Sequence, residues 1–362
     1  MSEWFAPLVD WYRLMPQEEA VRLVRLAIAF VLCLGAVVGS FLNVCIYRIP
    51  LGQSVSRPRS HCFSCGKTIP WYLNVPILSW LILRGRCANC HAPISVRYPV
   101  IEALTAVLFL LVFQMWANPR LFLLDPIPGQ APALILFYWL FVASVVVDVM
   151  IDIDHRILLD RISLGGTLIA LAVSAAFPIL HGAASWWPAL LASLGGAAVG
   201  FGAGFAIAWA GERIFLQDAF GFGDVKWLML FGALFGWRGA LFILMLAAFV
   251  GLAMGLVALA AARFRRAPAD ADADDGAPLA IPFGPALGAA ALLWLFWGNL
   301  LVDGLFAAHA WAFAHRTAVL AALFPLLLLS CGWLIYRIRA IRRAAQDDAL
   351  EELPDDPEDK GV

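Results

Sequence analysis

Long apolar stretches recur along the whole 362-residue chain, and they constrain its fold more than any other feature. A helix needs about 20 consecutive apolar residues to cross the hydrocarbon core of a bilayer, and stretches of that kind begin near residue 26. The composition agrees, because 62% of the residues are hydrophobic and only 14% are charged, which is unusual for a soluble domain. The sequence therefore predicts an all-α polytopic membrane protein in a lipid bilayer.

We expect eight to nine transmembrane helices from these stretches. The candidate spans lie near 26–46, 99–116, 133–151, 162–180, 188–210, 225–237, 240–262, 284–302 and 317–336. The sixth is short for a full crossing, and the sequence GWRG at 236–239 joins it closely to the seventh. The pair is either a re-entrant hairpin or one tilted short helix, and we interpret 225–237 as a short helix.

Basic residues indicate which side of the membrane each loop occupies, since short cytoplasmic loops are enriched in Lys and Arg. They gather in 47–98, in the loops near 155–161 and 213–226, and after 262 and 336. These loops are therefore expected in the cytoplasm, together with the acidic end of the chain, which is typical of a solvated, disordered tail. The basic residues do not gather on one face, which argues against a nucleic-acid partner.

Two C-x2-C pairs lie in the sequence HCFSCGKTIPWYLNVPILSWLILRGRCANCH at 61–91. Each pair can present two thiolates from one tight turn, and two such turns make a tetrahedral, closed site for a structural Zn²⁺. The expected ligands are Cys62, Cys65, Cys87 and Cys90. Two disulfides or four buried thiols are the alternatives, and a reducing cytoplasm argues against the disulfides. His61 and His91 adjoin the pairs and could replace a cysteine.

Carboxylates gather where the third span ends and where the sixth begins. The sequence VVVDVMIDIDHRILLDR occupies 145–161, and GFGD occupies 221–224. Two carboxylates that share a proton can activate water against a carbonyl without a metal, so an aspartic-protease site is one interpretation. Solvated carboxylates at helix ends, or an ion- or proton-coupled transporter that uses membrane aspartates, are the alternatives. No G-x-S-x-G motif occurs, which disfavours a serine hydrolase.

Several motifs in order over residues 36–290 resemble the type IV prepilin peptidase family. They are GSFLNVCIYRIP, the paired C-x2-C around WYLNVPILSWLILRGRC, PISVRYPVIEALTA, IDIDHRILLD, GFGDVKW and IPFGPALG. The resemblance implies an aspartic endopeptidase of the G-x-G-D type in the bacterial inner membrane, with its active site facing the cytoplasm. Such enzymes cut the short basic leader from type IV prepilins and type II secretion pseudopilins after a glycine.

The resemblance also implies a second activity. Family members with this cysteine-bearing loop methylate the new N-terminal residue, with S-adenosylmethionine as the methyl donor. The chain contains no Rossmann-type glycine fingerprint, so the sequence itself assigns no residues to binding of the donor.

Carried over position by position, the family's catalytic aspartates fall on Asp152 and Asp224. The supporting residues are then Asp154, Gly221, Gly223 and Lys226. The two glycines would let the backbone bring Asp224 against Asp152 and leave room for an extended substrate, Asp154 would orient or tune the pair, and Lys226 would anchor its span at the membrane interface. Asp148 matches no family position and is expected to be paired locally.

The chain departs from the family pattern at three places. Leu159 and Asp160 stand where Pro-Asp is usual, Leu73 stands where an acid is usual, and a ninth span with a tail follows the usual last one. The predicted organisation is therefore an N-terminal segment with the first span (1–47), a cytoplasmic zinc-binding domain (48–98), a membrane peptidase core (99–302), a further C-terminal span (303–336) and a basic, then acidic, cytoplasmic tail (337–362).

Overall fold

The computed structural model describes residues 16–117, 131–215, 220–265 and 282–315, together with the single positions 329, 332, 336 and 339. The long helices are α2 (Gln17–Arg48), α4 (Arg97–Ala117), α6 (Ala131–His155), α7 (Asp160–Ala176), α8 (Trp186–Phe215), α9 (Phe222–Arg265) and α10 (Gly284–Ala314). The short helices are η1 (Trp71–Leu73), α3 (Leu78–Ile82) and η2 (Pro178–His181). The all-α prediction is confirmed, because the described residues form helices and two isolated β-bridges but no strand.

Six of the described helices are long and apolar enough to cross a membrane. The helix α7, with 17 residues, matches the predicted fourth span only as far as Ala176. It ends there because Phe177 precedes Pro178, and a residue before proline avoids the helical conformation. Apart from positions 329, 332, 336 and 339, the predicted ninth span and the C-terminal tail lie outside the described residues.

The helix α9 reverses direction at Gly236, where the backbone has φ 73° and ψ 175°. Three close contacts at glycines join α9 to α10. Trp227 of α9 lies against Gly288 of α10, Gly239 of α9 lies against Trp294, and Gly251 of α9 lies against Ala286. Residues 227 and 251 therefore both lie beside the first turns of α10, while 239 lies further along it. The label α9 thus covers two antiparallel limbs, which correspond to the predicted spans 225–237 and 240–262.

Glycines spaced four residues apart bring helices into backbone contact. A Cβ on Gly35 of α2 would lie 2.6 Å from the Cα of Ala106 in α4, and one on Gly39 would lie 2.7 Å from the Cα of Glu102. Gly196 of α8 and Gly232 of α9 oppose each other so closely that a Cβ on either would meet the other's backbone carbonyl. This is how membrane helices associate, since small residues let van der Waals contacts form along the backbones.

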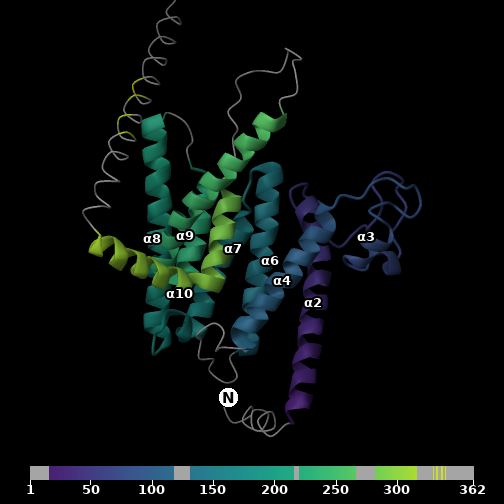
Figure 1. The fold of residues 1–362 in the computed structure, drawn as a ribbon, viewed down its shortest axis with the longest axis horizontal. Coiled ribbons are helices and arrows are strands. Elements are labelled where there is room, and N and C mark those ends of the chain that lie inside the picture. Colours follow the sequence, from purple (N-terminus) through teal and green to yellow (C-terminus); the bar gives the residue numbers. More distant parts are fainter. Residues whose placement is uncertain are drawn as a thin grey trace, which may run out of the picture. The chain divides into compact units, whose positions relative to one another are not determined.

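The chain divides into two compact units, Met1–Phe201 with Gly223–Gly298 and Gly202–Phe222 with Asn299–Val362. Within the first unit, α2, α4 and α6 pack side by side, and the loop between α2 and α4 extends from the end where α2 finishes and α4 begins (Figure 1). Both predicted catalytic aspartates and the four cysteines lie in the first unit, whereas Gly221 lies in the second.

Candidate metal centre and carboxylate site

The four predicted cysteines form one cluster in the loop between α2 and α4. Their Sγ atoms all lie within 4.8 Å of one another, and the Sγ atoms of Cys62 and Cys90 are 3.8 Å apart. A tetrahedral zinc with about 2.3 Å bonds to sulfur would set its ligand sulfurs about 3.8 Å apart, so this cluster fits a metal of that kind. The cluster contains neither His61 nor His91. The described cysteines are all free, which excludes the disulfide alternative for these four.

Each C-x2-C pair lies in a tight turn of the same form. The N–H of Gly66 donates to the carbonyl of Cys62 at 2.8 Å, and the N–H of His91 donates to the carbonyl of Cys87 at 3.0 Å. Gly66 and His91 occupy equivalent positions and both have a left-handed backbone, with φ of 69° and 58°. His91 is therefore part of the turn and not a ligand, and its positive φ is the conformation that the second turn requires.

Backbone N–H groups also point at the sulfurs. The N–H groups of Cys90 and Asn89 lower the pKa of Cys87 to about 6, and the N–H of Lys67 lowers the pKa of Cys65. The Asn89 side chain donates to the Sγ of Cys65 at 3.6 Å and accepts from the Lys67 Nζ at 3.0 Å, which ties the second turn to the first. Lowered pKa values favour the thiolate, which is the form that binds a metal.

Asp148 connects three elements at the carboxylate site. Its side chain is 0% exposed, and its two oxygens accept the backbone N–H of Leu159 at 3.3 Å and the Nε1–H of Trp227 at 2.9 Å. Deeper in the bundle the rings of Phe141 and Phe231 meet edge to face, so α6 and the first limb of α9 run antiparallel. Asp148 thus has the predicted local partner, Leu159, and also a distant one, Trp227, which lies 79 residues away in the sequence.

The hydrogen bond between Asp148 and Trp227 indicates where the two predicted catalytic aspartates lie relative to each other. Asp152 lies one turn after Asp148 on α6, and Asp224 lies three residues before Trp227 on α9. Because α6 and α9 are antiparallel, Asp152 and Asp224 both lie toward the same end of the bundle. Each is about 5 Å along its helix from the Asp148–Trp227 hydrogen bond, on the helix face that makes this bond. Asp152 is 6% exposed and Asp224 is 8% exposed. The fold therefore brings two buried carboxylates to one level on neighbouring helices.

The first residue of α10 contacts Asp152 directly. The backbone N–H of Gly284 donates a hydrogen bond to the Asp152 carboxylate, and a Cβ on Gly284 would lie 2.9 Å from the Asp152 Cγ. Only a residue without a side chain fits there. The positive end of α10 is thus directed at this carboxylate, with Arg156 also near enough to act on its charge. The motif IPFGPALG predicted no role for Gly284, although the glycine next to Pro285 is a signal that could have indicated one.

The supporting residues have partners that their spacing did not predict. Asp154, 30% exposed, pairs with Arg97, the first residue of α4, at 2.7 Å, and Arg97 also donates to the Met150 carbonyl at 3.3 Å. Lys226 pairs with Asp160, the first residue of α7, at 2.5 Å. Each pair links the start of one helix to an element that carries a predicted catalytic aspartate.

The two glycines before Asp224 differ in their surroundings. A Cβ on Gly223 would meet the Leu158 side chain at 3.1 Å, so this glycine lets the segment after α6 pack on the start of α9. Gly221 is exposed. Leu158 and its neighbours occupy the connection in which Leu159 and Asp160 replace the family's Pro-Asp, and Asp160 still begins a helix there.

The fold and the site define a class of protein. It is a polytopic helical protein with a four-cysteine loop and two buried carboxylates at one end of adjacent helices. Two family models match the chain: the bacterial peptidase A24 N-terminal domain over residues 33–116, and the type IV leader peptidase family over residues 134–256. No solved structure matches it.

Several curated proteins similar to this chain are named as prepilin leader peptidases. A prepilin leader peptidase/N-methyltransferase of Stutzerimonas stutzeri is 33% identical over 298 residues, which is 75% of this chain and 92% of that protein. One of the same name from Myxococcus xanthus is 40% identical over 232 residues, 64% of this chain and 63% of that protein. A type 4 prepilin-like proteins leader peptide-processing enzyme of Escherichia coli is 36% identical over 230 residues, 57% of this chain and 75% of that protein. The chain belongs to the type IV leader peptidase family, and it is an enzyme of the protease class.

Proposed function

We propose that the protein removes the basic leader peptide from type IV prepilins and type II secretion pseudopilins, and methylates the residue that becomes N-terminal. The relatives' names support both activities, because they combine a prepilin leader peptidase with an N-methyltransferase. The observation that carries the peptidase is the pair of buried carboxylates, Asp152 and Asp224, at one level on α6 and α9. No observation favours the transporter alternative.

The proposed cleavage uses water and the two aspartates. One carboxylate takes a proton from the attacking water, while the other, protonated, donates a hydrogen bond to the carbonyl oxygen of the scissile peptide. Gly284 holds Asp152 in place through its N–H, and Asp148 fixes the relative position of α6 and α9 one turn away. The roles of Asp154 and Lys226 are then to position these helix ends through their ion pairs.

The metal is proposed to be a structural Zn²⁺ held by all four cysteines. Four thiolates complete a tetrahedral shell, so no coordination position remains for water or substrate. The ion would hold the two turns together in a loop whose short elements bury no residue.

The protein is proposed to lie in the bacterial inner membrane with its carboxylate site facing the cytoplasm. The positively charged loop between α2 and α4 supports this orientation, because such loops stay on the cytoplasmic side. The Asp152 end of α6 lies at the same end as this loop, since Arg97 at the loop's exit pairs with Asp154. The basic leader of a membrane-inserted prepilin would be on that side.

The test is a reaction of purified protein with a prepilin and S-adenosylmethionine, followed by mass spectrometry of the pilin N-terminus. We expect a shortened pilin that begins at the residue after the cleavage-site glycine and carries one added methyl group. An uncut prepilin with a correctly inserted enzyme would contradict the peptidase, and a cut but unmethylated pilin would contradict the methyltransferase alone.

A further inference from the structure

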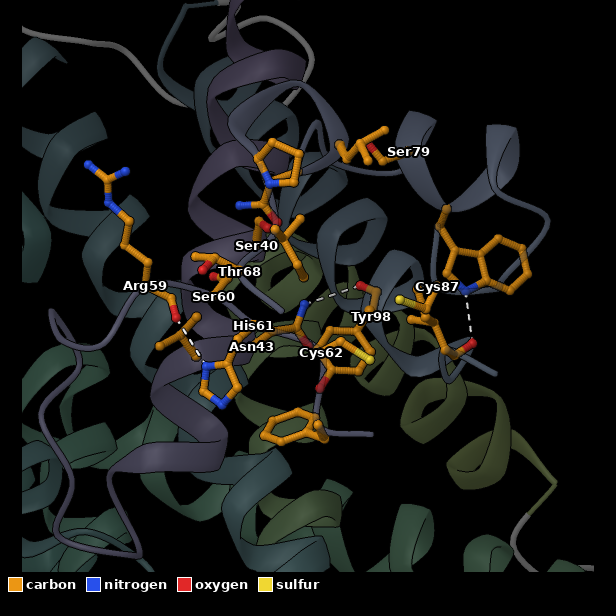
Figure 2. Close-up of a pocket in the computed structure, with 18 of the residues that line it drawn as sticks. Ser40, Asn43, Arg59, Ser60, His61, Cys62, Thr68, Ser79, Cys87 and Tyr98 are labelled. Atoms are coloured by element: carbon orange, nitrogen blue, oxygen red, sulfur yellow. Dashed lines mark hydrogen bonds between the residues drawn. The ribbon is translucent and has the colours of Figure 1, made fainter. Parts of the chain in front are cut away.

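The four-cysteine loop lies beside α2 and not only beyond its end. Asn43 of α2 donates to the Tyr98 carbonyl of α4 at 3.2 Å (Figure 2), and next to this bond a cavity of about 1670 Å³ separates the two helices from the loop. The cavity reaches along α2 to the exposed, apolar side chains of Phe41 and Val37. These residues precede Arg48 by about 10 and 16 Å along the helix. Since α2 is long and apolar enough to cross a membrane, we expect the loop to lie at the level of the membrane interface.

The loop exposes large apolar side chains on and near α3. Trp71, Leu78, Leu81 and Ile82 have 82%, 57%, 57% and 76% of their surfaces exposed, and α3 buries no residue. Exposed apolar patches of this kind mark sites of contact with a membrane or with another protein. Tryptophan and aliphatic side chains are typical of segments that lie in the membrane interface.

A smaller, positively charged cavity adjoins this apolar segment. It has a volume of about 530 Å³, and Ile82, Arg84 and Arg86 are among the residues that line it. Both arginines are exposed, and neither takes part in an ion pair within the described part of the chain. Two guanidinium groups beside one cavity suit a phosphate group, because each can donate two parallel hydrogen bonds to phosphate oxygens.

The backbone between the two arginines is held by the rest of the loop. The N–H of Ile94 donates to the Gly85 carbonyl at 2.7 Å, and a Cβ on Gly85 would lie 2.9 Å from the Trp80 ring. The Trp80 indole donates to the Ile94 carbonyl at 3.0 Å, so it joins α3 to the segment after the second C-x2-C pair. These contacts place the arginines beside the apolar side chains of α3 and leave both guanidinium groups available to a ligand.

The charge of the loop indicates what covers this face. Residues 49–96 contain Arg57, Arg59, Lys67, Arg84 and Arg86 but no Asp or Glu. An anionic surface is therefore attracted to the loop, whereas the basic leader of a prepilin would be repelled by it. Anionic phospholipids supply such a surface, and each Lys or Arg close to it strengthens binding about fivefold.

We propose that the loop docks on the surface of the surrounding membrane and binds an anionic phospholipid there. The side chains of Leu78, Leu81 and Ile82 enter the boundary between headgroups and acyl chains. Arg84 and Arg86 bind the phosphate of the lipid in the smaller cavity. The docked loop is thus held by the membrane on its outer face and by α2 and α4 on its inner one.

Hydrogen exchange of the full-length protein in lipid nanodiscs, followed by mass spectrometry, tests this docking. In discs of phosphatidylcholine with about one quarter phosphatidylglycerol, we expect the backbone N–H groups of 78–86 to exchange at least about tenfold more slowly than in discs of phosphatidylcholine alone. The double variant Arg84→Gln with Arg86→Gln should lose this difference between the two lipids. Arg84→Lys with Arg86→Lys keeps the charge and should keep most of it.

The matched control is Arg57→Gln with Arg59→Gln, which removes two exposed arginines of the same loop that lie outside the smaller cavity. Its exchange rates should stay within about twofold of wild type in both lipids. Equal exchange of the wild-type protein in the two lipids would overturn the proposal, and so would protection that appears only when a prepilin is added. Elemental analysis accompanies each variant, because loss of metal from the glutamine variant would assign the two arginines to the four-cysteine cluster and not to a lipid.

Discussion

At the scale of single residues, Asp152 and Asp224 are the groups on which proposed cleavage depends. If they act as one unit, Asp152→Asn and Asp224→Asn should each lower the rate of leader removal by at least about 10³-fold, and the double variant should be no slower than either single one. The rates can be followed by the mobility shift of prepilin on gels, with insertion levels checked for each variant. Cleavage by a correctly inserted Asp224→Asn protein would move the chemistry to another carboxylate.

The variant Asp148→Asn should be compared with Asp152→Asn and Asp224→Asn, because it alters a buried aspartate to which no catalytic role is assigned. An amide keeps an acceptor for only one of the two donors, Leu159 N–H and Trp227 Nε1–H, that Asp148 now accepts. We expect the variant to cleave, but with stability lowered by about 1–3 kcal/mol because one buried donor loses its partner. Its thermal unfolding in detergent, measured beside its activity, separates this structural contribution from catalysis.

Gly284 gives a prediction that the sequence motif did not contain. In Gly284→Ala the new methyl group would meet the Asp152 carboxylate, so either the aspartate or the start of α10 must shift. We expect cleavage to fall about 100-fold or more, since a displacement of about 1 Å costs that much in a positioned site. Gly304→Ala, in the same helix with nothing within 4 Å of the added Cβ, should cleave like wild type. Normal activity of Gly284→Ala would exclude the contact with Asp152 as a requirement.

At the scale of helices, the Arg97–Asp154 pair links the end of the four-cysteine loop to the last turn of α6. Both charges oppose the helix dipoles, because a cation begins α4 and an anion lies in the last turn of α6. An exposed pair of this kind contributes at most about 1 kcal/mol, so its arrangement points to positioning of the helix end and not to stability.

The exchange of the two charges tests this positioning role. Arg97→Ala and Asp154→Asn should each lower kcat for cleavage about two- to fivefold with little change in KM. The charge-exchanged double variant, Arg97→Asp with Asp154→Arg, should recover most of the loss and unfold no more easily than wild type, because both dipoles are then favourable. Arg161→Ala serves as the control for loss of one exposed positive charge. Equal activity of all these variants would show that the pair has no positioning role.

At the scale of the whole molecule, the four-cysteine loop lies between α2 and α4, and we expect its order to depend on a bound metal. The purified protein should contain about one zinc per chain, and the combined Cys62→Ser and Cys87→Ser changes should abolish binding and expose 58–95 to protease. Elemental analysis and limited proteolysis measure the two effects. Because the proposed ion would be structural, loss of cleavage should be partial and should follow damage to the loop. A metal-free protein with a protease-resistant loop would contradict the structural role.

The sequence alone determined the class of fold, the four-cysteine cluster and the family. Apolar stretches of sufficient length can only be helices in a bilayer, because every backbone polar group must be bonded within its own segment. The C-x2-C spacing is similarly local: each turn fixes two ligands within four residues, so the cluster follows once two such turns meet. These features depend on neighbours in sequence, which is why they could be predicted.

The tertiary structure alone decided what surrounds each site residue. Asp148, Asp152, Asp154 and Asp160 lie within one short stretch and look alike in the sequence, yet their partners are Trp227, Gly284, Arg97 and Lys226, which come from three other helices. The antiparallel return of α9 at Gly236 and the close helix crossings at glycines set these distances. Such contacts join residues up to 132 positions apart, as between Asp152 and Gly284, and depend on helix packing that no local pattern encodes.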